Sequence, residues 1–214
     1  MYLICMKGYY NMDLTSPRTI RNIQEQFGFT FKKGLGQNFL TARNILEEIV
    51  DAAEIESGVI EVGPGFGVLT SELAQNSDKV VTIEIDERLI DVLDYTLAEY
   101  DNVKIINEDI LKLDLKKVID DEFNGEKVSI AANLPYYITT PIITKLLEEK
   151  LPIKNIVVMV QKEVAERMSA KPSTKDYGAI TVLCQYYTEP SIVANVPASL
   201  FVPPPKVDLS LIHI

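Results

Sequence analysis

The sequence predicts an α/β fold in which helices cover both faces of a mostly parallel sheet. One observation is a short buried strand at 59–62, which leads through three alternate glycines, Gly63, Gly65 and Gly67, into a helical pattern. The other is that strand-like apolar runs and helical patterns alternate from Val59 onward. Together these observations indicate one layered domain with seven strands.

Two amphipathic helices are expected before the glycine turn. Ser16 and Pro17 are typical of a helix start, and Gly28 is expected to end that helix. Thr41 is expected to cap the second helix. The buried stripe of the second helix is expected to comprise Ile45, Leu46, Ile49, Val50 and Ala53.

Beyond the glycine turn the chain is expected to alternate regularly. The strands expected after the first are 80–85, 103–106, 128–132, 156–160, 192–196 and 207–214. The helices expected between them are 87–97, 140–147, 162–168 and 179–187. The polar stretch 171–178 is expected to form a loop at the rim of the site.

Composition excludes several classes of protein. With 214 residues, 47% hydrophobic and 24% charged, the chain suits one well-buried domain. No apolar run approaches the roughly 20 residues that a membrane span needs, so a cytoplasmic protein is expected. Cys5, Cys184 and His213 cannot supply the usual zinc site or a disulfide framework, and they disfavour a Ser-His or Cys-His nucleophile.

The net charge of −10 argues against nucleic acid as a partner, because phosphate binding depends on Lys and Arg. Residues 1–44 are nevertheless net basic and include Lys32 and Lys33, which are candidates for RNA phosphate contacts. From charge alone, a basic segment that meets RNA and an ordinary solvated surface both remain open.

The spacing of the glycines bears on the ligand. Glycine permits positive φ and lets a ligand lie against the main chain, and the following helix start offers unpaired N–H groups. A dinucleotide fingerprint would place its third glycine at position 68, where this chain has Val68. Gly63-x-Gly65-x-Gly67 instead resembles the first motif of S-adenosylmethionine-dependent methyltransferases.

Polar side chains stand at the ends of three consecutive predicted strands. In open parallel sheets the ligand lies at the carboxyl ends of the strands. Glu84 is suited to accept hydrogen bonds from a ribose diol, and Asp109 from an adenine amino group. Asn133 ends the fourth strand. Each of these residues could be an ordinary surface or capping group, but their coincidence at one edge favours a nucleoside site.

Further motifs carry a family resemblance. The run Asn133-Leu134-Pro135-Tyr136 is similar to the motif of adenine-N6 methyltransferases. The stretch 34–40, Gly-Leu-Gly-Gln-Asn-Phe-Leu, and the stretch 201–208, Phe-x-Pro-x-Pro-Lys-Val-Asp, resemble the early and late motifs of the ribosomal RNA adenine dimethyltransferases. The early motif is closer to the bacterial small-subunit members than to the resistance methylases that act on large-subunit RNA.

This resemblance implies a class I S-adenosylmethionine-dependent methyltransferase of the Rossmann-like type, with seven strands and the last one antiparallel. It implies S-adenosyl-L-methionine as cofactor, S-adenosyl-L-homocysteine as product and 16S rRNA of the small ribosomal subunit as substrate. The reaction would dimethylate N6 of two adjacent adenines in the 3′-terminal hairpin during ribosome biogenesis. A monomer with no metal and no membrane attachment is expected.

The resemblance also assigns residues. The expected cofactor contacts are Gln37, Asn38, Leu40, Gly63, Gly65, Glu84, Ile85, Asp109, Ile110 and Asn133. The expected catalytic group is Asn133, Leu134, Pro135, Tyr136 and Phe201. Pro135 favours an extended Leu134, whose carbonyl and the Asn133 amide oxygen would accept the two N6–H groups of adenine. Tyr136 and Phe201 are expected to stack on the extruded base, with core packing as the alternative for each.

Domain boundaries and rival functions complete the expectations. Residues 1–12 are expected to form a flexible extension and 13–214 the methyltransferase domain with its N-terminal helix, without the helical C-terminal domain of the family. One rival is an RNA-binding assembly factor without catalysis, and another is the same chemistry on DNA or large-subunit RNA. A nicotinamide oxidoreductase is disfavoured by Val68 and by the run 133–136.

Overall fold

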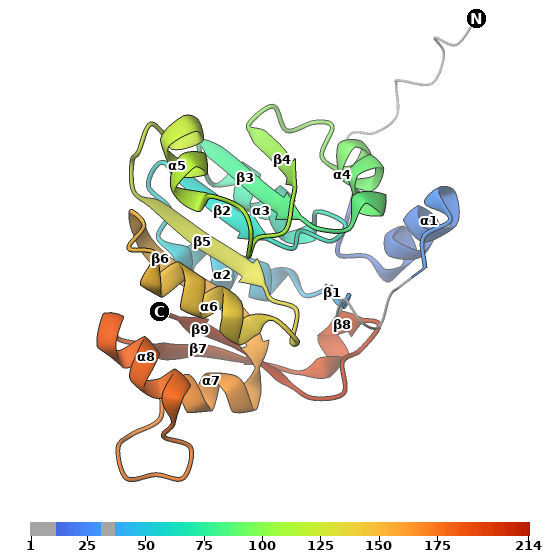
Figure 1. Cartoon of the computed structure of the whole chain (residues 1–214). Helices are drawn as coiled ribbons and strands as arrows, with labels where there is room; N and C mark the ends of the chain where they lie inside the picture. The colour runs from blue at the N-terminus through green and yellow to red at the C-terminus, as the bar shows by residue number, and fades with distance from the viewer. Residues whose placement is uncertain (1–11, 31–36) are drawn as a thin grey trace, which may run out of the picture.

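A twisted sheet runs through the middle of the protein, with helices on both of its faces (Figure 1). The computed structural model describes residues 12–30 and 37–214. Within these residues the main sheet has seven strands in the order β4-β3-β2-β5-β6-β9-β7. The strands are β2 (Gly58–Val62), β3 (Lys79–Glu84), β4 (Val103–Asn107), β5 (Val128–Asn133), β6 (Ile153–Gln161), β7 (Ser191–Val196) and β9 (Leu209–His213). In this sheet β9 runs antiparallel to the other six strands, which confirms the predicted fold.

The helices divide into two layers, each with its own hydrophobic core. One layer contains α1 (Pro17–Phe27), α2 (Arg43–Ala53), α3 (Val68–Gln75) and α4 (Ile90–Thr96). The other contains α5 (Leu115–Phe123), α6 (Thr139–Glu148), α7 (Lys162–Met168) and α8 (Ala179–Tyr187). Side chains alternate across the strands, so Val59 packs in the first core and Ile60 in the second. None of the described helices is long and apolar enough to cross a membrane.

Glycine ends the first helix as predicted. Gly28 follows α1 with φ of +59°, and its N–H donates to the carbonyl of Glu25 at 3.4 Å. The second helix differs from the prediction, because Ala42 occupies its N-cap position. Thr41 instead donates from both its N–H and its hydroxyl to the carbonyl of Leu200, each at 2.8 Å. A hydroxyl engaged in this long-range contact does not cap the helix.

A second, two-stranded sheet was not predicted. In it β1 (Phe39–Leu40) pairs antiparallel with β8 (Phe201–Val202), which follows the short 3₁₀ turn η3 (Ala198–Leu200). The pairing places Leu40 opposite Phe201. This small sheet therefore attaches the segment before α2 to the C-terminal part of the chain.

Other elements also depart from the predictions. The helix α5 was not predicted, and the expected helix 87–97 is divided into the 3₁₀ turn η2 (Glu87–Leu89) and α4. The stretch 171–178 joins α7 to α8, and none of its residues lines the cavity described below (Figure 1). The expected extension at 1–12 lies, except for residue 12, outside the described residues, as do Lys32, Lys33 and positions 34–36 of the early motif.

Candidate cofactor and substrate site

A cavity opens at the carboxyl edge of the sheet, where β2 and β5 diverge into connections on opposite faces. Its wall combines the ends of β2 to β5 with the segment that precedes α2. All ten residues expected to contact a cofactor lie around it, namely Gln37, Asn38, Leu40, Gly63, Gly65, Glu84, Ile85, Asp109, Ile110 and Asn133. The fold therefore brings together residues from five separate stretches of sequence, and their role as cofactor contacts stays a prediction.

The glycine turn after β2 lines this cavity through Gly63 and Gly65. Gly63, Gly65 and Gly67 all have positive φ, between +60° and +82°, which side chains other than glycine rarely adopt. A Cβ added at Gly63 would meet no atom within 4 Å, so the main chain there borders open space. A Cβ at Gly65 would lie 2.5 Å from the ring of Phe39. Glycine is thus required at 65 by packing as well as by conformation.

Two buried carboxyl groups stand beside the turn. Glu84 accepts a hydrogen bond from the N–H of Asp86 at 2.8 Å, and burial raises the pKa of Glu84 to about 7. Glu61, on β2, is 1% exposed and accepts from the hydroxyl of Thr70 at 2.6 Å. Burial raises the pKa of Glu61 to about 7 as well, and the nearby Glu84 adds to the rise. These carboxyl groups give the cavity a site for hydrogen-bond donors or positive charge.

Asp109 lies at the end of β4 on the same edge. One of its carboxylate oxygens accepts from the N–H of Leu111 at 3.0 Å, and the other is 3.8 Å from the ammonium of Lys112. The carboxylate therefore fixes the turn that follows β4. The buried side chain of Ile110 contributes an apolar surface next to it.

Asn133 faces the cavity from the end of β5. Its side-chain N–H group donates to the main-chain oxygen of Asn38 at 3.0 Å, which orients the amide. The N–H of Leu134 donates to the main-chain carbonyl of Met159 at 3.1 Å and so continues the β5–β6 ladder. Pro135 accepts from the hydroxyl of Thr139 at 3.0 Å and so closes the turn into α6. The run 133–135 is thus held on both sides, and the contact with Asn38 uses the nitrogen of the Asn133 amide, not its oxygen.

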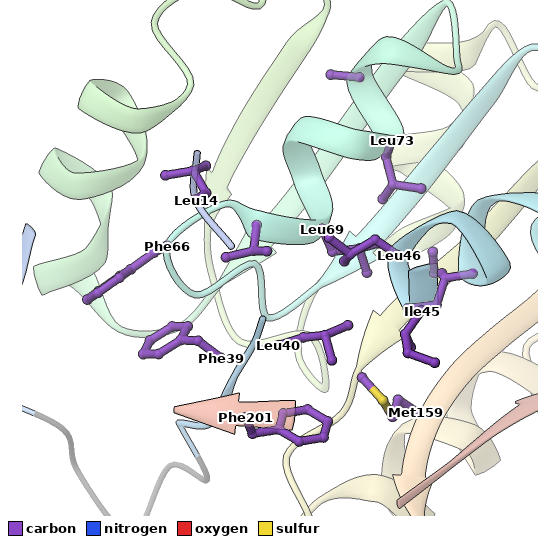
Figure 2. Close-up of a cluster of buried hydrophobic side chains, with 14 of the residues drawn as sticks. Leu14, Phe39, Leu40, Ile45, Leu46, Phe66, Leu69, Leu73, Met159 and Phe201 are labelled. Atoms are coloured by element: carbon purple, nitrogen blue, oxygen red, sulfur yellow. The ribbon is translucent and has the colours of Figure 1, made fainter. Parts of the chain in front are cut away.

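Neither of the two expected aromatic stacking partners lines the cavity. Phe201 is 2% exposed and packs in the core near Leu40 and Met159 (Figure 2). Because the protein's own side chains cover its ring, a base cannot stack on it in this arrangement. Tyr136 is half-buried, outside the cavity wall, and its hydroxyl accepts from the side chain of Asn38 at 3.4 Å. Burial raises the pKa of Tyr136 to about 12.

Tyr137 and Glu61 are among the residues of the cavity wall that sequence reasoning missed. The exposed Tyr137 lines the cavity, whereas the sequence analysis assigned a role only to its neighbour Tyr136, as a stacking partner of the base. The doubled tyrosine was a signal, but the sequence does not show which ring faces the site. Glu61 also lines the cavity, and an acid inside a buried apolar strand was the signal for it.

The cavity fits S-adenosylmethionine. Open space above Gly63 allows a ligand to approach the main chain. Glu84 offers a buried acceptor for hydroxyl groups, and Ile85 and Ile110 offer apolar surface for a nucleobase. Burial raises the pKa of Glu61 and of Glu84 to about 7, and a ligand that carries positive charge would favour the ionised form of both carboxyl groups. Among the described residues, no group of three or more His, Cys, Asp or Glu side chains could hold a metal ion.

Residues 28–214 match the ribosomal RNA adenine dimethylase family. The chain is 54% identical over 205 residues to the ribosomal RNA small subunit methyltransferase A of Bacillus mycoides, which covers 94% of this chain and 70% of the relative. The structure is similar to a dimethyladenosine transferase from Plasmodium falciparum, with a TM-score of 0.72, 35% identity and coverage of 82% of this chain and 62% of that one. The 23S rRNA methyltransferase ErmE is also similar, with a TM-score of 0.69, 31% identity and coverage of 82% and 68%.

Proposed function

The chain belongs to the ribosomal RNA adenine dimethylase family, and we propose that it transfers methyl groups from S-adenosylmethionine to N6 of adenine in small-subunit rRNA. The products would be two adjacent dimethyladenines in the 3′-terminal hairpin of 16S rRNA and S-adenosylhomocysteine. The relatives named small subunit methyltransferase A support this choice of RNA. The proposal includes a cytoplasmic location and a monomeric enzyme.

The observation that carries the proposal is the placement of Asn133. Its amide lies on the wall of the cavity that also contains the glycine turn and Glu84. The contact with the main-chain oxygen of Asn38 orients the side chain so that its oxygen is the available acceptor. An amine that reaches this oxygen is therefore adjacent to the cofactor cavity.

The chemistry follows from the weak nucleophilicity of an adenine amine, whose lone pair is delocalised into the ring. The Asn133 oxygen and the Leu134 carbonyl are proposed to accept the two N6–H bonds and so favour a tetrahedral nitrogen. The ladder bond from Leu134 to Met159 fixes the main chain at that point. Positioned acceptors of this kind act by orientation and electrostatics. The proton of the product becomes acidic, so no side chain has to act as a strong base.

The cofactor, when bound, supplies an electrophilic methyl group on a positively charged sulfur. Glu84 is proposed to accept from the ribose hydroxyls, and Asp109 from the adenine amino group. Gly63 and Gly65 allow the ligand to approach the main chain. Tyr137 is proposed to cover the mouth of the cavity, because it lines the wall and remains half-exposed.

The test is methyl incorporation by the wild type and by Asn133→Ala. Removal of an oriented hydrogen-bonding group at a reacting centre is expected to lower kcat by about 10²–10³-fold. Binding of S-adenosylmethionine, measured by calorimetry, should change much less. Asn155→Ala is a matched control, because Asn155 on β6 also donates from its side chain to a main-chain carbonyl, that of Ala53 at 3.2 Å, but away from the cavity.

The substrate is tested by incubation of the enzyme with labelled S-adenosylmethionine and unmodified small subunits, large subunits or DNA in parallel. Incorporation into small subunits alone supports the proposal. Incorporation into large subunits alone would assign the substrate class of the ErmE relative instead. Subunit binding with no incorporation in any sample would favour an assembly factor without catalysis.

A further inference from the structure

We propose that the ion pair between Asp86 and Arg88 is a positioning element, which holds residues 37–38 between the cofactor cavity and Asn133. The inference rests on the proposed function, because it assigns these residues a part in cofactor binding. Neither Asp86 nor Arg88 lines the cavity itself. Their effect is therefore expected to reach the ligand through Gln37 and Asn38, which do line it.

The ion pair has two contacts between the guanidinium and the carboxylate. Arg88 donates from Nη2 to Oδ2 of Asp86 at 2.5 Å and from Nε to Oδ1 at 2.8 Å. Asp86 is buried, and the pair holds the pKa of its carboxyl below the usual range. A two-point contact of this kind fixes direction as well as distance. The carboxylate therefore remains charged and oriented beside Glu84.

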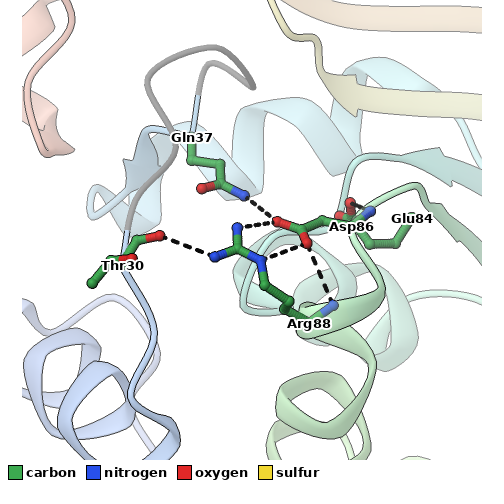
Figure 3. Close-up of polar contacts among 5 residues, drawn as sticks. All are labelled: Thr30, Gln37, Glu84, Asp86 and Arg88. Atoms are coloured by element: carbon green, nitrogen blue, oxygen red, sulfur yellow. Dashed lines mark hydrogen bonds and ion pairs between the residues drawn. The ribbon is translucent and has the colours of Figure 1, made fainter.

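Both described residues that flank positions 31–36 contact this pair. On one side Gln37 donates from Nε2 to Oδ2 of Asp86 at 3.1 Å. On the other side Thr30 accepts from Nη1 of Arg88 at 3.4 Å, and the ring of Phe29 lies 4.8 Å from the guanidinium carbon. Figure 3 shows these contacts meeting at Asp86 and Arg88. Asp86 and Arg88, in the connection between β3 and α4, thus hold Thr30 and Gln37.

The anchored residues 37–38 also contact the end of β5 and the turn that follows it. Asn38, next to Gln37, accepts from the Asn133 side chain at 3.0 Å and donates to the Tyr136 hydroxyl at 3.4 Å. Residues 37 and 38 therefore connect β3 with β5 across the cavity. If the contacts at Asp86 are removed, the segment gains freedom that a ligand must remove again on binding. The apparent affinity then equals the intrinsic affinity multiplied by the fraction of molecules that keep the competent arrangement.

A purely local role for Asp86 is separable by experiment. Asp86 also caps η2, because its carboxylate accepts from the N–H of Arg88 at 3.4 Å. This cap needs only one side-chain oxygen and no guanidinium. Arg88→Gln therefore leaves the cap in place while it removes the ion pair and the contact with Phe29.

Lys79→Gln provides a matched control at the opposite end of β3. Lys79 and Arg88 have the same side-chain exposure, 37%, and Lys79 is 2.7 Å from the carboxylate of Glu122. Its ammonium also lies over an aromatic ring, that of Phe123, at 5.9 Å. Lys79 does not line the cavity. The two variants thus remove similar interactions, and only one of them is next to the 37–38 segment.

The experiment measures the dissociation constant for S-adenosylmethionine by calorimetry and the melting temperature of each variant. Arg88→Gln is expected to raise the dissociation constant about tenfold, which corresponds to about 1.4 kcal/mol. Lys79→Gln is expected to leave the constant within about twofold while its melting temperature falls as much as that of Arg88→Gln. Arg88→Lys should recover part of the affinity, because an ammonium restores the charge but only one contact.

A double-mutant cycle with Gln37→Ala gives a second measure. If the pair acts through Gln37, the effects of Gln37→Ala and Arg88→Gln on affinity are less than additive. Equal affinity of wild type and Arg88→Gln, or the same loss in Lys79→Gln, would refute the positioning role. A wild-type protein that does not bind S-adenosylmethionine would instead refute the proposed function.

Discussion

Replacement of Glu61 by glutamine tests whether this buried carboxyl reduces stability at neutral pH. The side chain is 1% exposed on β2, and burial raises its pKa from 4.5 to about 7. Glutamine keeps the shape and can still accept from the hydroxyl of Thr70, which lies 2.6 Å from the carboxylate. The substitution therefore removes the ionisation and leaves the packing nearly unchanged.

The sign and size of the effect follow from the two pKa values. The carboxyl binds its proton more tightly in the folded state than in the unfolded state, so its contribution to stability is complete below about pH 4.5. That contribution is lost as the pH rises through about 7. A shift of about 2.5 units at 1.36 kcal/mol per unit gives about 3 kcal/mol. For a chain of this length this corresponds to roughly 6–12 °C in melting temperature.

The assay is denaturant unfolding of wild type and Glu61→Gln between pH 4.5 and 8.5. The chain has no tryptophan, so far-ultraviolet circular dichroism is the suitable signal. The two proteins should have similar stability at pH 4.5, and the variant should be more stable by about 3 kcal/mol at pH 8.5. A difference that stays constant across this range would mean that Glu61 titrates normally in the folded protein, and the reasoning from burial would be wrong.

Three further results are expected. Affinity for S-adenosylmethionine should fall as the pH drops through about 7, because Glu84 must be ionised to accept from two hydroxyls. Calorimetry should show that the affinity of Glu84→Gln depends less on pH than that of the wild type. Gly65→Ala should lower unfolding stability by about 1–3 kcal/mol more than Gly28→Ala, because both have φ near +60° but only Gly65 has a ring 2.5 Å from the added Cβ. Tyr137→Ala should weaken cofactor binding with little change in melting temperature, whereas the exposed Tyr186, outside the cavity wall, should tolerate alanine in both measurements.

Local sequence patterns predicted most of the fold. The helices α7 and α8 have the predicted bounds, and the strands differ from prediction by a few residues at their ends. The helix α5 was omitted although Leu115, Val118, Ile119 and Phe123 fall on one face and Asp114 caps its start. In contrast, β1 and β8 pair through two residues each, across most of the chain length. No local pattern could reveal such a pairing, because it depends on where the rest of the fold places the two segments.

In the candidate site, too, some residues could be predicted from the sequence and others could not. Residues at strand ends, such as Glu84 and Asn133, could be assigned to one cavity because parallel strands end at the same edge of a sheet. The positions of aromatic rings could not be assigned, because small rotations of a turn decide which ring faces inward. Phe201 is directed into the core by its pairing with Leu40. Tyr137 lines the cavity wall, and the stacking of Tyr136 on the target base stays a prediction.

The strand order sets the length of the ligand that this cavity can hold. Glu84 ends β3, the glycine turn follows β2, and Asn133 ends β5, and these three strands are neighbours in the sheet. Neighbouring strands are about 4.8 Å apart, so the strands that carry Glu84 and Asn133 are separated by about 10 Å. A group bound at Glu84 can therefore meet an amine at Asn133 only if it extends across the glycine turn. Side chains other than glycine at positions 63 and 65 would stand in that path or displace Phe39, which explains why the turn needs both.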